Sequence, residues 1–163
     1  GVKLSALARE EILERRARNE LAEKEWLGRL KKWRRELDDL DKRKLAYESL
    51  AGIRDPVAIG PLGQFFAGER TRPVKTLYIE VLAKFVSPQA VKVLVDRALN
   101  DSDEEVFHYI IGTLSERQPP HVGDAFVQAL ADGNNVKVNR GATALARLSG
   151  AVGAATRRFV VLR

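Results

Sequence analysis

The two histidines are the first residues to test for catalysis or metal binding. His108 lies within a helical pattern beside a column of apolar residues, and His121 follows Pro120 in a turn. Neither has His, Cys or carboxylate neighbours at the spacing of a zinc site. The chain also contains no cysteine, which excludes disulfides and thiolate chemistry. We therefore predict no metal site.

The acidic run "DSDEE" at 101–105 is the next candidate, because alternating carboxylates can wrap a calcium ion. A calcium loop needs Gly at its sixth position, where this chain has Val106. The run fits a helix start better, with a capping box from Ser102 to Glu105. The motifs for phosphate loops, dinucleotide binding, serine hydrolysis and zinc proteolysis are absent. We expect a non-catalytic protein without a cofactor.

The elements that carry these residues recur along the chain. Pro56, Pro88 and Pro120 are 32 residues apart, and each stands before an apolar helical pattern. Proline suits the first turn of a helix, and Asp55 and Ser87 before two of these prolines are favoured helix caps. The helix that precedes each turn keeps its apolar columns under the same 32-residue shift, and the pattern predicts Leu82 and Leu94 in the core. A fourth unit follows, with a cap at Asn134 or Asn135 and a closing helix near residues 151–162.

Two-helix units at such a period predict an all-α solenoid. The units contain the turns "DPVAIGPL" and "SPQAVKVL" and the helices "VKTLYIEVL", "VFHYIIGTL" and "VKVNRGATAL". These segments resemble HEAT repeats of the short bacterial kind. The resemblance implies a right-handed α-solenoid of about four repeats over residues 41–163, in units of about 41–68, 69–100, 101–132 and 133–163. It also implies a scaffold that binds a protein or peptide partner. Some HEAT-like repeat proteins resemble alkylpurine DNA glycosylases, but both tryptophans lie outside the repeats, which disfavours a base-binding pocket.

In HEAT-like stacks the second helices line the concave face, and their outward columns form the candidate partner surface. The 32-residue register assigns to it Gln64, Gln89, Lys92, Asp96, His121, Asp124 and Gln128. These residues are polar and mixed in charge, which suits a protein or peptide partner better than a polyanion.

Residues 1–40 form a charged arm of strong helix formers, which we expect to be helical and to cap the first repeat. Trp26, Leu30, Trp33, Leu37 and Leu40 form its apolar stripe. Basic residues beside Trp33 are the alternative functional surface, for nucleic acid or another anion: Arg29, Lys31, Lys32, Arg34 and Arg35. Flanking acidic residues from Glu23 to Asp41 weaken this alternative by cancelling the charge at short range.

The charge of the whole chain is moderately basic. Its 28 Lys and Arg against 22 Asp and Glu give +6, and residues 1–44 hold 14 of the basic and 10 of the acidic side chains. No apolar run approaches the ~20 residues of a membrane-spanning helix. We expect a soluble chain, either cytoplasmic or exported after removal of a signal, because a start at Gly1 leaves both open.

Overall fold

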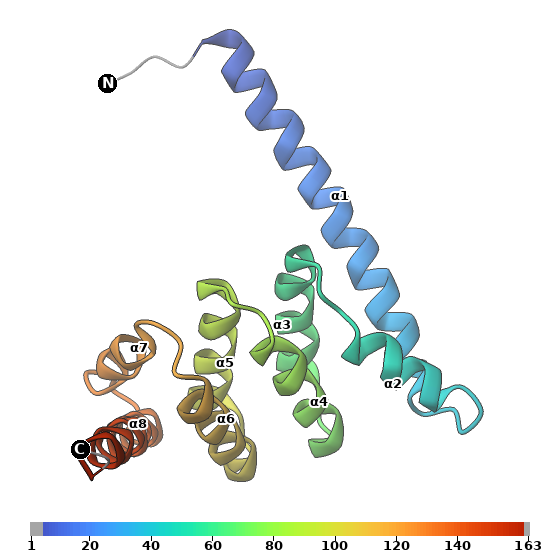
Figure 1. The fold of residues 1–163 in the computed structure, drawn as a ribbon. Helices are drawn as coiled ribbons and strands as arrows, with labels where there is room; N and C mark the ends of the chain where they lie inside the picture. The colour runs from blue at the N-terminus through green and yellow to red at the C-terminus, as the bar shows by residue number, and fades with distance from the viewer. Residues whose placement is uncertain (1–4, 162–163) are drawn as a thin grey trace. The chain divides into compact units, whose positions relative to one another are not determined.

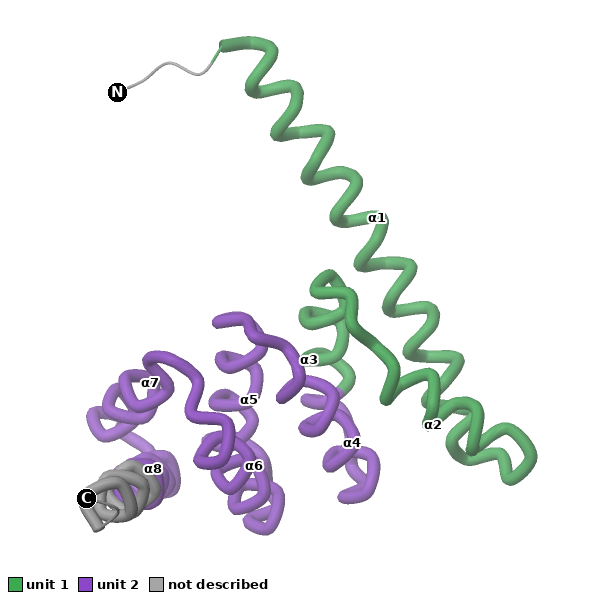
Figure 2. The backbone as a smooth tube through the Cα atoms, viewed as in Figure 1, with its two compact units in different colours: residues 1–65 green, residues 66–163 purple. Residues whose placement is uncertain are grey.

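The computed structural model describes the backbone of residues 5–161 and the side chains of residues 5–150. All regular secondary structure in this range is helical, so the predicted all-α class is confirmed (Figure 1). The chain divides into two compact units, residues 1–65 and 66–163, which meet within α3 (Ile59–Gly68) (Figure 2). The sequence analysis places its boundary after residue 40 instead. The difference arises because the arm packs against the two helical segments that follow it.

The first unit is built on one long helix, α1 (Ala6–Glu36), followed by α2 (Arg43–Ala51) and the short 3-10 helix η1 (Pro56–Ala58). The C-terminal part of α1 packs against α2 and η1, and it buries Trp26 and Leu30. The Trp26 indole N–H donates a hydrogen bond of 3.2 Å to Asp55 Oδ2. Leu37 is buried as expected, but Leu40 is 82% exposed. The prediction for Leu40 is wrong because α1 ends before it, at Glu36.

The second unit contains α4 (Arg72–Ala83), α5 (Pro88–Asn100), α6 (Glu104–Arg117), α7 (Val122–Ala129) and α8 (Asn135–Val161). Helices α4, α6 and α8 pack side by side in one layer, and α5 and α7 form a second layer against them (Figure 1). The core between the layers holds Tyr78, Phe107 and Phe126. Leu82 and Leu94 are buried there, as the 32-residue pattern predicts.

The turns before α5 and α7 contain the spaced prolines. Pro88 is the first residue of α5, whereas Pro120 lies one residue before the N-cap of α7, His121. Ser87 makes no side-chain capping hydrogen bond, so that detail of the prediction is wrong. Asp55 does cap, since its Oδ1 accepts the backbone N–H of Val57 at 3.0 Å.

The turns before α2, α4, α6 and α8 share a side-chain hydrogen bond that the sequence pattern does not predict. In each, an acidic side chain accepts a hydrogen bond from the backbone N–H two residues later. The four pairs are Asp39 with Asp41, Glu69 with Thr71, Asp101 with Asp103, and Asp132 with Asn134, at 2.8–3.1 Å. Such side-chain turns stop one helix and orient the next. Their recurrence every 30 to 32 residues is an internal repeat of local structure.

The caps that follow these turns differ in part from prediction. Asp103 is the N-cap of α6, and its Oδ1 accepts the Glu105 N–H at 3.0 Å, so the capping box from Ser102 is wrong. The backbone of Asp103 is extended, as at most N-caps, so its carboxylate caps the helix more directly than the side chain of the preceding serine. Asn134 caps α8 as expected, because its Oδ1 accepts the Val136 N–H at 2.9 Å.

Helix α8 departs most from the sequence analysis. It runs from Asn135 to Val161 as one helix, where two helices were expected. No proline interrupts this range, and isolated glycines are tolerated within helices. The side chains of the expected closing helix near residues 151–162 lie outside the described residues. Near its start α8 lies close to α7. A Cβ added at Gly141 would lie only 3.1 Å from the Phe126 carbonyl oxygen.

Candidate partner-binding groove

A groove of about 620 Å³ runs between α5 and α7 in the second unit. Five residues of the predicted partner surface line it: Lys92, Asp96, His121, Asp124 and Gln128. The structure thus brings together predicted residues of two successive repeats, with Lys92 and Asp124, and Asp96 and Gln128, 32 positions apart in the chain. Asp132, from the turn before α8, and Lys137, near the start of α8, also line the groove, and the sequence pattern predicts neither.

Helical spacing explains why these side chains share the groove. Lys92 and Asp96 are four residues apart on α5, and Asp124 and Gln128 are four apart on α7, so each pair lies on one helix face. All four side chains are exposed. Smaller apolar residues line the same groove between them, and Val95 and Ala129 are buried. The result is an apolar floor with polar walls, which is the usual composition of a site for a polypeptide.

The charges on the groove walls are only partly neutralised within the protein. Lys137 Nζ lies 3.8 Å from Asp132 Oδ2, and His121 Nδ1 lies 3.4 Å from Asp124 Oδ2, in pairs that remain solvent-exposed. Within the part of the chain that the structure describes, the side chains of Lys92 and Asp96 have no polar partner. A cation and an anion four residues apart are therefore free to pair with an incoming chain.

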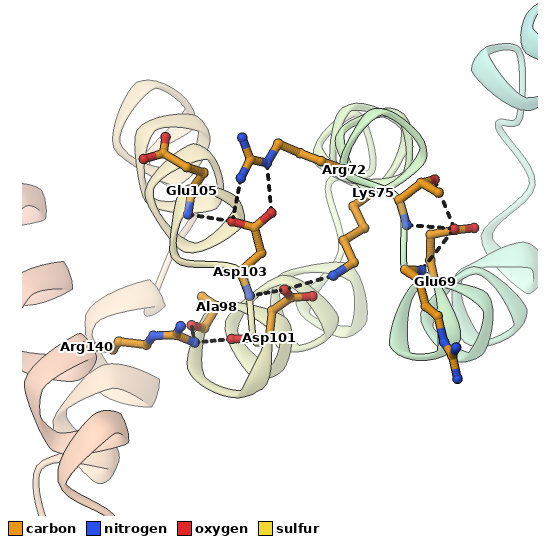
Figure 3. A network of polar contacts seen from close by, with 10 residues as sticks. Glu69, Arg72, Lys75, Ala98, Asp101, Asp103, Glu105 and Arg140 are labelled. Carbon is orange, nitrogen blue, oxygen red and sulfur yellow. Dashed lines mark hydrogen bonds and ion pairs between the residues drawn. The ribbon is translucent and has the colours of Figure 1, made fainter.

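A buried ion pair fixes the turn at the C-terminal end of α5. Lys75 Nζ donates to Asp101 Oδ1 at 3.0 Å, and the side chains of the pair are only 7% and 3% exposed (Figure 3). The same oxygen accepts the Asp103 N–H at 2.8 Å. Lys75 belongs to α4, so this pair ties the turn to the other layer of helices.

Arg140 of α8 holds the same turn from its other side. Its guanidinium donates to the backbone carbonyls of Ala98 and Asp101 at 3.1 and 2.6 Å (Figure 3). It also lies over the Phe107 ring, with its Cζ 5.3 Å from the ring centroid. Buried cations need such partners on every side, because an unpaired charge in the interior is costly. Together, Lys75 and Arg140 fix the end of α5 and hence one wall of the groove.

A solvent-exposed ion pair completes this network. Arg72 donates two hydrogen bonds to the Asp103 carboxylate, at 2.8 and 3.1 Å. The hydrogen bond from Arg72 is the main cause that lowers the pKa of the Asp103 carboxyl, and it raises the pKa of Arg72 in return. The pair therefore stabilises the folded state only while Asp103 is ionised.

A second, apolar pocket of about 360 Å³ adjoins the groove at the N-terminal ends of α5 and α7. The turns 84–87 and 118–121 enclose it, and the two cavities share Pro88, Val91, Pro120 and His121. The residues lining it are mostly apolar, and Arg117 is the one side chain among them with a permanent charge. The sequence analysis missed this pocket. The apolar pair Phe85 and Val86 in a turn directly before Ser87 and Pro88 was the signal for it.

Two residues of the predicted surface lie elsewhere. Gln64 is exposed on α3 but belongs to the first unit, and Gln89 is exposed on α5 without lining the groove.

The predicted basic set on α1 is partly engaged by residues close to it in the chain. Lys32 Nζ lies 4.0 Å from Glu36, Arg34 pairs with Asp38 at 2.9 Å, and the Arg29 guanidinium lies 4.8 Å from the Trp26 ring centroid. Lys31 and Arg35 are exposed. Local pairing thus takes up part of the positive charge that an anion would need.

The described residues hold no group of three or more metal-ligating side chains, and none of their helices has the length and apolar character to cross a membrane. Comparison with protein-family models, curated proteins and solved structures finds no match to this chain.

Proposed function

We propose that the chain is a HEAT-like repeat protein that binds a protein or peptide partner in the groove between α5 and α7, without catalysing a reaction. The observation that carries this proposal is the convergence of Lys92, Asp96, His121, Asp124 and Gln128 on one groove. Unpaired charges of both signs above an apolar floor favour a polypeptide over a polyanion, which would meet Asp96, Asp124 and Asp132.

The repeat assignment has separate support. The acidic turn recurs before α2, α4, α6 and α8, and the helices of the second unit lie in two layers with alternate helices adjacent. Both features are expected when one two-helix unit stacks on the next. In this proposal the stack is a right-handed solenoid, α5 and α7 line its concave face, and the C-terminal part of α1 caps the first repeat. An experimental structure with the opposite superhelical hand would contradict it.

The experiment is affinity capture from a lysate of the source cells, with and without nuclease treatment. The bait is the whole chain, compared with the variant Lys92→Asp/Asp96→Lys, which reverses both unpaired charges and keeps the net charge. The control outside the groove is Lys31→Asp/Arg35→Asp, which replaces two exposed basic residues of α1. We expect a protein partner that is retained by the wild type and the α1 control and lost by the groove variant.

The same experiment tests the nucleic-acid alternative. Binding through phosphate contacts weakens steeply with salt and disappears with nuclease treatment. Capture that depends on nucleic acid, and that the α1 variant abolishes while the groove variant keeps it, would replace the peptide-binding proposal with an α1 anion site.

A further inference from the structure

The residues that line the apolar pocket beside the groove favour one class of ligand. Leu82, Leu94 and Leu114 form its buried base, and Phe85 and Val86 form part of its rim. At about 360 Å³ it lies at the small end of ligand pockets, which span roughly 300 to 1,000 Å³. It is therefore sized for a single large apolar group.

Among the lining residues that the structure describes, Arg117 supplies the only permanent charge, and none of them places a carboxylate beside it. Within the described residues its guanidinium has no hydrogen-bond or ion-pair partner. An apolar group that carries a carboxylate beside it would satisfy both the pocket and the arginine. A basic group in the same place would meet Arg117 at short range and be repelled.

The pocket adjoins the groove, and both are lined by Pro88, Val91, Pro120 and His121. A chain lying in the groove would thus reach the pocket at the N-terminal ends of α5 and α7. Anchoring of one large side chain in a pocket, with polar contacts around it, is how most peptide interfaces gain their affinity.

We propose that the apolar pocket receives an aromatic or large aliphatic side chain of the peptide partner, and that Arg117 pairs with an acidic residue next to it. This inference rests on the proposed function and narrows it to partners that present an apolar residue adjacent to Asp or Glu. The groove walls then add contacts along the remainder of the peptide.

The test uses defined tetrapeptides and methyl NMR of the whole chain. Acetyl-Ala-Phe-Asp-Ala-amide is titrated to millimolar concentration, beside analogues with Asn in place of Asp or Ala in place of Phe. We expect the Phe-Asp peptide to shift the methyl signals of Val86, Val91 and Leu94. The Phe-Asn peptide should bind about two- to fivefold more weakly, as the loss of one exposed ion pair implies. The analogue without Phe should leave these signals in place.

Three variants separate the possible outcomes. Arg117→Gln should remove the preference for Asp over Asn while keeping the response to Phe. Arg70 is an exposed arginine outside the pocket, so Arg70→Gln should keep both the preference and the response. Ala83→Leu adds a side chain to the half-buried lining and should abolish the response. Lys92→Asp/Asp96→Lys should leave tetrapeptide binding within about twofold of wild type, so failure of the groove and failure of the pocket remain distinguishable.

Three results would overturn the inference. One is the absence of shifts at the lining methyls with the Phe-Asp peptide, and another is an Asp preference that survives Arg117→Gln. The third is a response to hexanoate at concentrations where the peptides give none, which would make the pocket a site for small carboxylic acids instead. None of the three affects the groove, whose own test is the capture experiment.

Discussion

The buried pair between Lys75 and Asp101 gives the sharpest stability prediction. The substitution Asp101→Ala leaves the ammonium of Lys75, whose side chain is 7% exposed, without its anion, and it also removes the acceptor of the Asp103 N–H. Removing one partner of a buried ion pair costs about 3–5 kcal/mol. We therefore expect the free energy of unfolding to fall by about that amount, and the urea midpoint to fall by roughly 2 M.

The chain contains its own control for this substitution. Asp132 accepts the Asn134 N–H at 2.8 Å just as Asp101 accepts that of Asp103, but its lysine partner, Lys137, has a side chain that is 33% exposed. Asp132→Ala therefore removes the same kind of turn hydrogen bond without burying a lone charge, and it should cost about 1 kcal/mol. The difference between the two variants isolates the cost of the buried charge.

The assay is urea denaturation followed by far-UV circular dichroism, because both tryptophans lie in the first unit and their fluorescence does not report on this pair. Adding Lys75→Met to Asp101→Ala should recover at least about 1 kcal/mol, since the second change removes the stranded ammonium. Equal losses for Asp101→Ala and Asp132→Ala, together with no recovery by Lys75→Met, would refute this reasoning.

Three further perturbations test other parts of the structure. Asp55→Ala should cost about 1–2 kcal/mol, because it removes both the cap of η1 and the acceptor of the Trp26 indole; an unchanged melt by tryptophan fluorescence would argue against these contacts. Gly141→Val should cost about 1–3 kcal/mol, since its Cβ would meet backbone of α7, and a neutral result by circular dichroism would mean that the helices separate easily. Because Arg72 lowers the pKa of Asp103, the pair stabilises the fold above the unfolded carboxyl pKa of about 3.9, and this stabilisation is lost as the pH falls further. Arg72→Gln should therefore lower the urea midpoint at pH 7 but not at pH 2. An equal deficit at both pH values would contradict the pairing.

The sequence pattern predicts what depends on local periodicity. The 32-residue shift places Leu82 and Leu94 in the core and Lys92, Asp96 and Asp124 on one groove, because helix faces follow directly from residue spacing. Its errors are also local, such as the choice of Ser102 over Asp103 as the cap of α6, where two adjacent residues compete for one role.

What the pattern could not predict depends on contacts between helices. Lys75 is buried at the position that Phe107 occupies one repeat later, and only the fold shows that Asp101, 26 residues away, makes its burial tolerable. Arg140 is buried for a similar reason, by carbonyls 39 and 42 residues earlier. The apolar pocket likewise needs two turns brought together, so spacing along the chain does not reveal it.

The most direct test of peptide binding in the groove is a hydrogen-exchange footprint of the partner. Once capture has supplied a partner, backbone amide exchange is compared with and without it. Peptide binding in the groove predicts added protection in α5 (Pro88–Asn100) and α7 (Val122–Ala129), which disappears for Lys92→Asp/Asp96→Lys. Protection confined to α1 (Ala6–Glu36), with none in α5 or α7, would contradict it.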